Sequence, residues 1–215
     1  MVAGGSLITI EGLDGAGKST LAHALKQELD ARGLTVELLR EPGGVEVSEH
    51  IRALVKDPSL SVTPRAEALL YAAARAQLVV ELVAPLLARG AVVVLDRFVD
   101  SSLAYQAGGR DLELAGVREI NRFATGGLEP DLTLLLRIHP AEGRARQAQR
   151  SLEQDRLERE AEEFFFKIAA AYEELARAEP QRIVVIDAAQ EPERVLADAL
   201  AAIEKLPAVE PLAAD

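Results

Sequence analysis

The sequence of 215 residues predicts an α/β fold, a single parallel sheet of five strands with helices on both faces. Two observations lead to it. Short β-branched runs alternate with longer segments in which apolar residues recur at helical spacing. A glycine-rich loop stands between the first of these runs and the first helical segment, the order that a phosphate-binding loop requires.

The elements follow in turn along the chain. Strands are expected at Leu7–Glu11, Thr35–Arg40, Val92–Asp96, Leu132–Arg137 and Ile183–Asp187. Helices are expected at Lys18–Arg32, Val45–Val55, Pro64–Arg89, Leu112–Ala124, Ala141–Gln149, Arg156–Ala178 and Glu191–Lys205. One domain is therefore predicted over residues 1–206. Residues 207–215 hold two prolines and little to bury, so we expect a disordered tail.

The composition excludes several classes of function. The formal charge of −11 and a pI near 4.9 disfavour a nucleic-acid partner, because an acidic surface repels a phosphate backbone. The absence of cysteine excludes disulfides and thiolate chemistry. The start of the chain lacks the pattern of a secretory signal, and charged residues, proline and glycine interrupt the apolar stretch Leu78–Leu95. We expect a soluble cytoplasmic protein without a membrane span.

The glycine-rich loop fits the pattern G-x-x-x-x-G-K-[ST]. It reads Gly12, Leu13, Asp14, Gly15, Ala16, Gly17, Lys18 and Ser19, and Thr20 continues into the helix. Glycine lets the backbone wrap closely around phosphates, whose charge the N–H groups and the helix N-terminus stabilise. Lys18 is expected to reach the β- and γ-phosphates of ATP, and the Ser19 hydroxyl to bind Mg²⁺. The motif predicts nucleotide binding and leaves the reaction open.

The third strand ends in Asp96 and Arg97, at the sheet edge where sites of such folds lie. Asp96 is a candidate Mg²⁺ ligand, and the fork of Arg97 suits a second phosphate. The alternative is a structural ion pair at the end of the strand.

Several separated motifs resemble those of bacterial thymidylate kinase. They are Arg40-Glu41-Pro42-Gly43-Gly44, Asp96-Arg97-Phe98 with Ser101-Ser102-Leu103-Ala104-Tyr105-Gln106, and Glu129-Pro130-Asp131-Leu132-Thr133, and the likeness runs from about Leu7 to Ile203. The resemblance implies a P-loop nucleoside monophosphate kinase with a short lid near residues 141–155. Such an enzyme forms a homodimer and phosphorylates dTMP with ATP and Mg²⁺.

The same resemblance implies the site for the acceptor. Tyr71, where the family generally has Phe, is expected to stack on thymine, and Arg75 to donate to a base carbonyl. Without the resemblance, Tyr71 is equally an aromatic residue of the core. The remaining implied substrate contacts are an arginine pair for the acceptor phosphate (Arg52, Arg97), the loop acid Asp14 near the 3′-hydroxyl, and Arg40, Pro42, Ser101, Ser102, Tyr105 and Gln106.

The lid contains three arginines within an otherwise acidic chain, Arg144, Arg146 and Arg150. Family members without a basic residue inside the phosphate loop carry the catalytic arginine in the lid, and Gly15 stands at the loop position concerned. Arg150 is the first candidate and Arg146, also a candidate ATP contact, the second, while a solvated basic helix face is the alternative. The predicted catalytic residues are thus Lys18, Arg97, Arg150 and Asp14.

Two rival functions remain open. A related P-loop kinase would act on another nucleoside monophosphate or on a deoxynucleoside, since few side chains distinguish the base. A P-loop switch or motor would hydrolyse ATP without forming a second nucleotide product. For the homodimer, the Pro64–Arg89 helix is the expected interface, because Leu69, Leu78, Leu82 and Leu86 could cover more than one of its faces.

Overall fold

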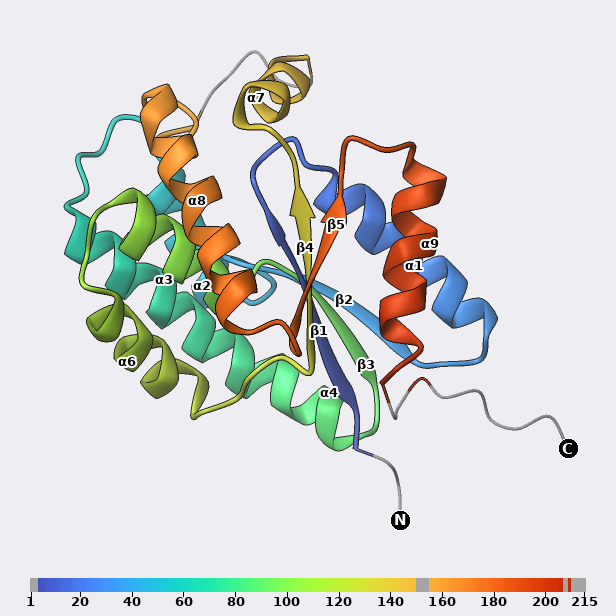
Figure 1. Cartoon of the computed structure of the whole chain (residues 1–215). Helices are drawn as coiled ribbons and strands as arrows, with labels where there is room; N and C mark the ends of the chain where they lie inside the picture. The colour runs from blue at the N-terminus through green and yellow to red at the C-terminus, as the bar shows by residue number, and fades with distance from the viewer. Residues whose placement is uncertain (1–3, 150–154, 207–208, 210–215) are drawn as a thin grey trace, which may run out of the picture.

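Five parallel strands form the centre of the computed structural model, which describes residues 4–149, 155–206 and 209 (Figure 1). The strands are β1 (Ser6–Gly12), β2 (Val36–Arg40), β3 (Val92–Asp96), β4 (Leu132–Arg137) and β5 (Ile183–Asp187), in the order β2-β3-β1-β4-β5. Their central residues are nearly continuous apolar runs, which a sheet covered on both faces requires. The predicted fold class is confirmed, and each strand lies within a residue of its predicted bounds.

Helices cover both faces of the sheet. On one face α1 (Lys18–Ala31) and α9 (Pro192–Ile203) pack against each other and against β2, β3 and β5. The other face carries α8 (Glu162–Ala178), α3 (Pro64–Leu78) and the short α5 (Val99–Ser102), with α2 (Glu46–Lys56) and α6 (Leu114–Thr125) packed on α3. The helix α7 (Pro140–Ala148) stands beyond the carboxyl end of β4 (Figure 1). This arrangement leaves the carboxyl edge of the sheet for a site.

The predicted Pro64–Arg89 helix is one helical stretch with a wider turn inside it. After α3 comes the π-helical turn η1 (Val79–Val83), where Ala84 donates to the carbonyl of Val79, and then α4 (Ala84–Ala88). Pro85 lacks an N–H group and its ring would collide with a carbonyl one turn earlier, so the wider turn relieves this conflict.

By length and composition alone, the stretch Pro64–Ala88 could cross a membrane. Its side chains place it in the core instead: Leu78, Val79, Val83 and Leu86 pack with Leu7, Val93 and Leu95 of the sheet. Buried charged side chains, Glu67 and Arg75, lie in the same helix. It is a core helix, as a hydrophobic stretch with interior ion pairs indicates.

Three segments differ from expectation. Residues 99–109, predicted as irregular, form α5 and the π-helical η2 (Leu103–Gly109). Residues 156–161, predicted as the start of α8, are a turn, because the Asp155 carboxylate accepts the N–H groups of Leu157 and Glu158 and competes with the helix. In the predicted tail, Val209 is 5% exposed and packs in the core, while the other tail residues lie outside the described part.

Candidate active site

The phosphate loop connects β1 to α1 at the carboxyl edge of the sheet. Gly15 and Gly17 have φ of 81° and 94°, a left-handed conformation that only glycine adopts without strain. A side chain at position 15 would also collide with α7, since its Cβ would lie 2.1 Å from the carbonyl oxygen of Gly143. The lid helix therefore rests against the loop at the one position where a basic residue was considered in the sequence.

Lys18 lies inside this loop and is 7% exposed. Its ammonium group donates to the carbonyls of Gly12 (3.2 Å) and Leu13 (2.9 Å) and lies 3.7 Å from the Asp14 carboxylate. Burial lowers the pKa of Lys18, and the neighbouring charge of Arg97 lowers it further. The side chain is thus held where loop phosphates would be bound.

Ser19 and Asp96 meet at the first turn of α1. The Ser19 hydroxyl donates to Oδ2 of Asp96 over 2.9 Å. No cluster of three or more acidic or histidine side chains exists among the described residues that could enclose a metal ion. A hydroxyl and one carboxylate suit Mg²⁺, which keeps most of its waters and binds substrate phosphates for the rest of its shell.

Arg97 joins the phosphate loop to the rest of the site. It has φ of 70°, unusual for a residue with a side chain, and its guanidinium donates to Asp14 (2.7 Å), Ser101 (3.0 Å) and Tyr105 (3.0 Å). Burial alone would lower the pKa of Arg97, but Tyr105 and Asp14 raise it well above its ordinary value. Arginine has five N–H donors, and within the described chain these contacts use three, so two remain for a ligand.

Asp14 is the acidic counterpart of Arg97. Desolvation would raise its pKa, but the charges of Arg97 and Lys18 outweigh this and hold the pKa well below the ordinary value. The carboxylate therefore stays ionised and fixes one end of the Arg97 fork. Tyr105, 5% exposed, lies under the same guanidinium, 4.9 Å from its ring centroid.

A cavity of about 390 Å³ opens beside these groups, within the size range of ligand sites. It brings together most of the predicted site residues: Asp14, Gly15, Gly17, Lys18, Ser19, Arg40, Pro42, Arg52, Tyr71, Arg75, Asp96, Arg97, Ser101, Ser102, Tyr105 and Gln106. Gly12, Leu13, Ala16 and Thr20 belong to the loop without lining the cavity. The sequence did not indicate the lining residues Glu41, Lys56, Gln147, Asp155, Leu157 and Glu158.

Tyr71 and the arginines of α2 and β2 form the outer part of this cavity. Burial raises the pKa of Tyr71, so its hydroxyl stays protonated. Arg52 donates to the carbonyl of Pro42 over 2.9 Å, and Arg40 forms an exposed ion pair with Glu49 at 2.8 Å. Both guanidinium groups lie beside the cavity rather than inside a protein network.

Arg75 occupies a different environment from the one expected. It is 1% exposed and donates to Glu41 (2.8 Å), Ser102 (2.9 Å), the Phe98 carbonyl (2.9 Å) and Asn121, which engages its whole fork. A base carbonyl would have to share one of these donors. Oε1 of Glu41 is the one buried side-chain oxygen without a hydrogen-bond partner in the described chain.

The lid arginines are held by protein groups. Arg144 lies over the ring of Phe165, 5.1 Å from its centroid, and Arg146 donates to the Ala188 carbonyl (2.9 Å) and to Glu142 (2.6 Å). Arg150, the first candidate, lies outside the described residues. Behind the lid, Arg156 donates to Glu67 (2.7 Å), a fully buried carboxylate that Arg110 also contacts at 3.1 Å.

A phosphate loop on β1, a serine–aspartate pair for a metal and an arginine fork in an adjacent cavity together define a P-loop kinase that holds two phosphorylated substrates. The sequence matches the family model "Thymidylate kinase" over residues 10–199. The chain belongs to the thymidylate kinase family.

Individual relatives agree. The chain is 49% identical to a thymidylate kinase of Oenococcus oeni, covering 94% of this chain and 96% of the relative. It is 44% identical to one of Deinococcus radiodurans, with 94% and 97% covered. Among solved structures it is similar to thymidylate kinase from Ehrlichia chaffeensis, with a TM-score of 0.78, 26% identity, and coverage of 94% of this chain and all of the other.

Proposed function

We propose that the chain, which as a thymidylate kinase converts dTMP to dTDP, binds ATP over the phosphate loop and dTMP in the cavity beside it. One observation carries this assignment: the Arg97 guanidinium donates to Asp14 of the phosphate loop and keeps two N–H groups for an acceptor phosphate. A kinase needs both phosphates within reach of each other, and this single side chain stands between their sites.

The residues of the loop supply alignment and charge stabilisation. Backbone N–H groups of residues 12–19 and the Lys18 ammonium hold the β- and γ-phosphates, and Ser19 with Asp96 holds Mg²⁺. When bound, Mg²⁺ neutralises charge on the β- and γ-oxygens. The acceptor phosphate oxygen then attacks the γ-phosphorus, and ADP leaves. We assign no general base, because positioning accounts for the chemistry.

The inner part of the cavity fits a pyrimidine nucleotide. Tyr71 offers its ring for stacking, and Asp14 and Tyr105 stand near the place of the sugar. Arg40 and Arg52 can share the acceptor phosphate with Arg97, and Pro42, Ser101, Ser102, Gln106 and Arg75 form the walls. The Arg75 fork, already engaged by Glu41, Ser102 and Phe98, reads the base only by sharing a donor, a more rigid arrangement than the free side chain expected from sequence.

We assign the catalytic arginine to the lid, with Arg150 before Arg146 and Arg144. The support is the contact between Gly15 and Gly143, which places α7 directly on the phosphate loop. A basic residue inside the loop has no room in this arrangement, so the guanidinium that stabilises the transferring phosphoryl group has to come from elsewhere. Closure of the lid would also exclude water, which otherwise hydrolyses ATP.

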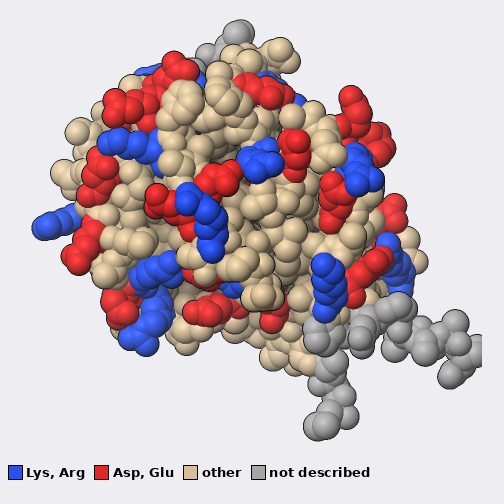
Figure 2. Space-filling model, in the orientation of Figure 1, with Lys and Arg blue, Asp and Glu red and all other residues tan. Residues whose placement is uncertain are grey.

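We propose a cytoplasmic homodimer. Among the exposed apolar side chains, Leu69 (57% exposed) lies on α3, Val80 (71%) on η1 and Phe123 (90%) on α6. α3 contacts both η1 and α6. Of the apolar residues predicted to cover several faces, Leu78 and Leu86 are buried against the sheet and Leu69 points outward. On the face shown in Figure 2, by contrast, Lys and Arg are interspersed with Asp and Glu.

The decisive experiment is an acceptor panel. The chain is incubated with ATP, Mg²⁺ and each of dTMP, dUMP, UMP, CMP, AMP and GMP, and the nucleotide products are separated by chromatography. We expect dTDP in strong excess over the other diphosphates. Another dominant diphosphate would refute the base site and leave the fold and phosphate sites intact. Formation of ADP and free phosphate alone would favour the switch or motor.

A further inference from the structure

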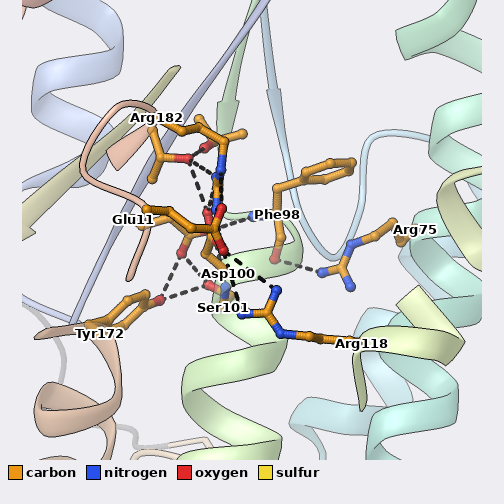
Figure 3. A network of polar contacts seen from close by, with 11 residues as sticks. Glu11, Arg75, Phe98, Asp100, Ser101, Arg118, Tyr172 and Arg182 are labelled. Carbon is orange, nitrogen blue, oxygen red and sulfur yellow. Dashed lines mark hydrogen bonds and ion pairs between the residues drawn. The ribbon is translucent and has the colours of Figure 1, made fainter. Parts of the chain in front are cut away.

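Glu11 is a fully buried carboxyl group at the base of the phosphate loop, next to Gly12 at the end of β1. It faces the segment that follows β3 (Figure 3). One oxygen, Oε1, accepts the backbone N–H groups of Phe98 (2.7 Å) and Ser101 (3.2 Å). The other, Oε2, accepts the hydroxyls of Ser101 (2.6 Å) and Tyr172 (2.7 Å). Its four partners are residues that the phosphate loop does not contain.

The Ser101 hydroxyl transmits this arrangement to Arg97. A serine hydroxyl has one proton to donate, and Ser101 gives it to Glu11. Its oxygen lone pairs are then free to accept the Arg97 guanidinium over 3.0 Å. Tyr172 of α8 lies 3.0 Å from the same hydroxyl and so holds it from the other side. The result is a directed chain of hydrogen bonds from Glu11 through Ser101 to Arg97.

The backbone of Arg97 needs this support as well. With φ of 70°, the residue is in a region that costs a side-chain-bearing residue free energy. The Arg97 N–H donates to Ile10 (3.1 Å) and the next N–H, of Phe98, to Glu11, so two consecutive residues of β1 hold the turn. A carboxylate at position 11 therefore fixes both the turn and the direction of the guanidinium that it presents.

We propose that Glu11 and Tyr172 are positioning residues for the acceptor phosphate, acting through Ser101 on the Arg97 fork. This rests on the proposed role of Arg97. Neither residue lines the cavity, so neither touches dTMP. The alternative is a buried polar cluster that only stabilises the core. The neighbouring set of Thr9, Thr133 and Asp100, joined over 2.8 and 3.0 Å, is of that kind because it makes no contact with Arg97.

The kinetic test compares Tyr172→Phe and Glu11→Gln with Thr9→Val. Tyr172→Phe retains the ring and removes one hydroxyl from Glu11. Glu11→Gln retains an acceptor for the two N–H groups and turns the Ser101 hydroxyl away from Arg97. We expect kcat/KM for dTMP to fall about fivefold and about tenfold, with KM for ATP unchanged. Thr9→Val removes an equally buried hydroxyl from the same strand and should lower only thermal stability.

A double-mutant cycle with Arg97→Ala separates positioning from core stabilisation. If Tyr172 acts through Arg97, Tyr172→Phe has no further effect on kcat/KM for dTMP once Arg97 is absent. Additive losses, or equal losses for ATP and dTMP, would overturn the inference. Should Glu11→Gln fail to fold, the Tyr172→Phe cycle decides alone. If Arg97→Ala itself retains full activity, the role of Arg97 is refuted and this inference with it, whereas additivity refutes the inference only.

Discussion

Replacing Arg97 by alanine removes the one guanidinium that contacts the phosphate loop and also faces the acceptor cavity. The substitution leaves Lys18, Ser19 and Asp96 unchanged. Alanine has the same Cβ as arginine, so the backbone at φ 70° is no more strained than before. Asp14, Ser101 and Tyr105 lose a partner at a cavity wall where water can replace it. The expected effect is therefore confined to the acceptor side.

Its size follows from the two N–H groups that Arg97 keeps for a ligand. A hydrogen bond between charged groups contributes roughly 1.5 to 3 kcal/mol, so two to a phosphate contribute about 3 to 6 kcal/mol. At about 1.4 kcal/mol for each factor of ten, kcat/KM for dTMP should fall by roughly two to four powers of ten. Arg97→Lys keeps a charge but not the planar fork, so it should fall between the two.

The measurement is steady-state kcat/KM for dTMP at saturating ATP and Mg²⁺, with ATP binding followed separately by calorimetry. Arg194→Ala serves as the control, because Arg194 is 68% exposed on α9 and pairs with Asp198. ATP binding should stay within about twofold of the unmodified chain in every variant. A value of kcat/KM for dTMP within about threefold of the original in Arg97→Ala would refute the assignment.

Three further predictions concern the metal, the dimer and pH. Ser19→Ala should raise the Mg²⁺ concentration for half-maximal rate about tenfold with KM for dTMP unchanged, and an unaltered Mg²⁺ titration would contradict the assignment. Phe123→Asp should dissociate the dimer in analytical ultracentrifugation, since a twofold interface loses the side chain twice, roughly 4 kcal/mol in all; a monomeric unmodified chain would refute the proposal. Burial outweighs Arg75 and raises the pKa of Glu41 from 4.5 to about 7, so the folded state binds an extra proton between these values and loses about 3 kcal/mol of stability as pH rises through that range. Glu41→Gln should flatten this dependence in thermal unfolding scans from pH 5 to 8, and a slope equal to that of the unmodified chain would assign it to other groups.

The strands and the phosphate loop could be predicted because their signals are local. An apolar run of five to seven residues, such as Val92–Asp96 or Ser6–Gly12, is long enough for a buried strand and too short for a helix. The loop motif depends on glycines whose φ only glycine adopts easily. The segment of residues 99–109 was missed since its π-helical turns do not follow the 3.6-residue period.

The buried carboxylates could not be found in the same way. Glu11 reads as an ordinary polar residue at a strand end, and its partners Phe98, Ser101 and Tyr172 lie 87, 90 and 161 residues away. Glu67 is fully buried only because Arg110 and Arg156, from distant segments, neutralise it. A charged residue in the core becomes visible only when the fold supplies the opposite charge, and no local pattern contains that information.

The distance between donor and acceptor phosphates is set by the sheet more than by the lid. Asp96 and Arg97 are consecutive, yet Asp96 meets Ser19 on the metal side and Arg97 meets Asp14 on the acceptor side. The left-handed turn at Arg97 sends the two side chains in these different directions. Because β3 is paired with β1 in fixed register, Ile10 opposite Asp96, the dipeptide and the phosphate loop move as one body. The lid arginines can then open and close over two phosphates whose relative position is already determined, as in-line transfer requires.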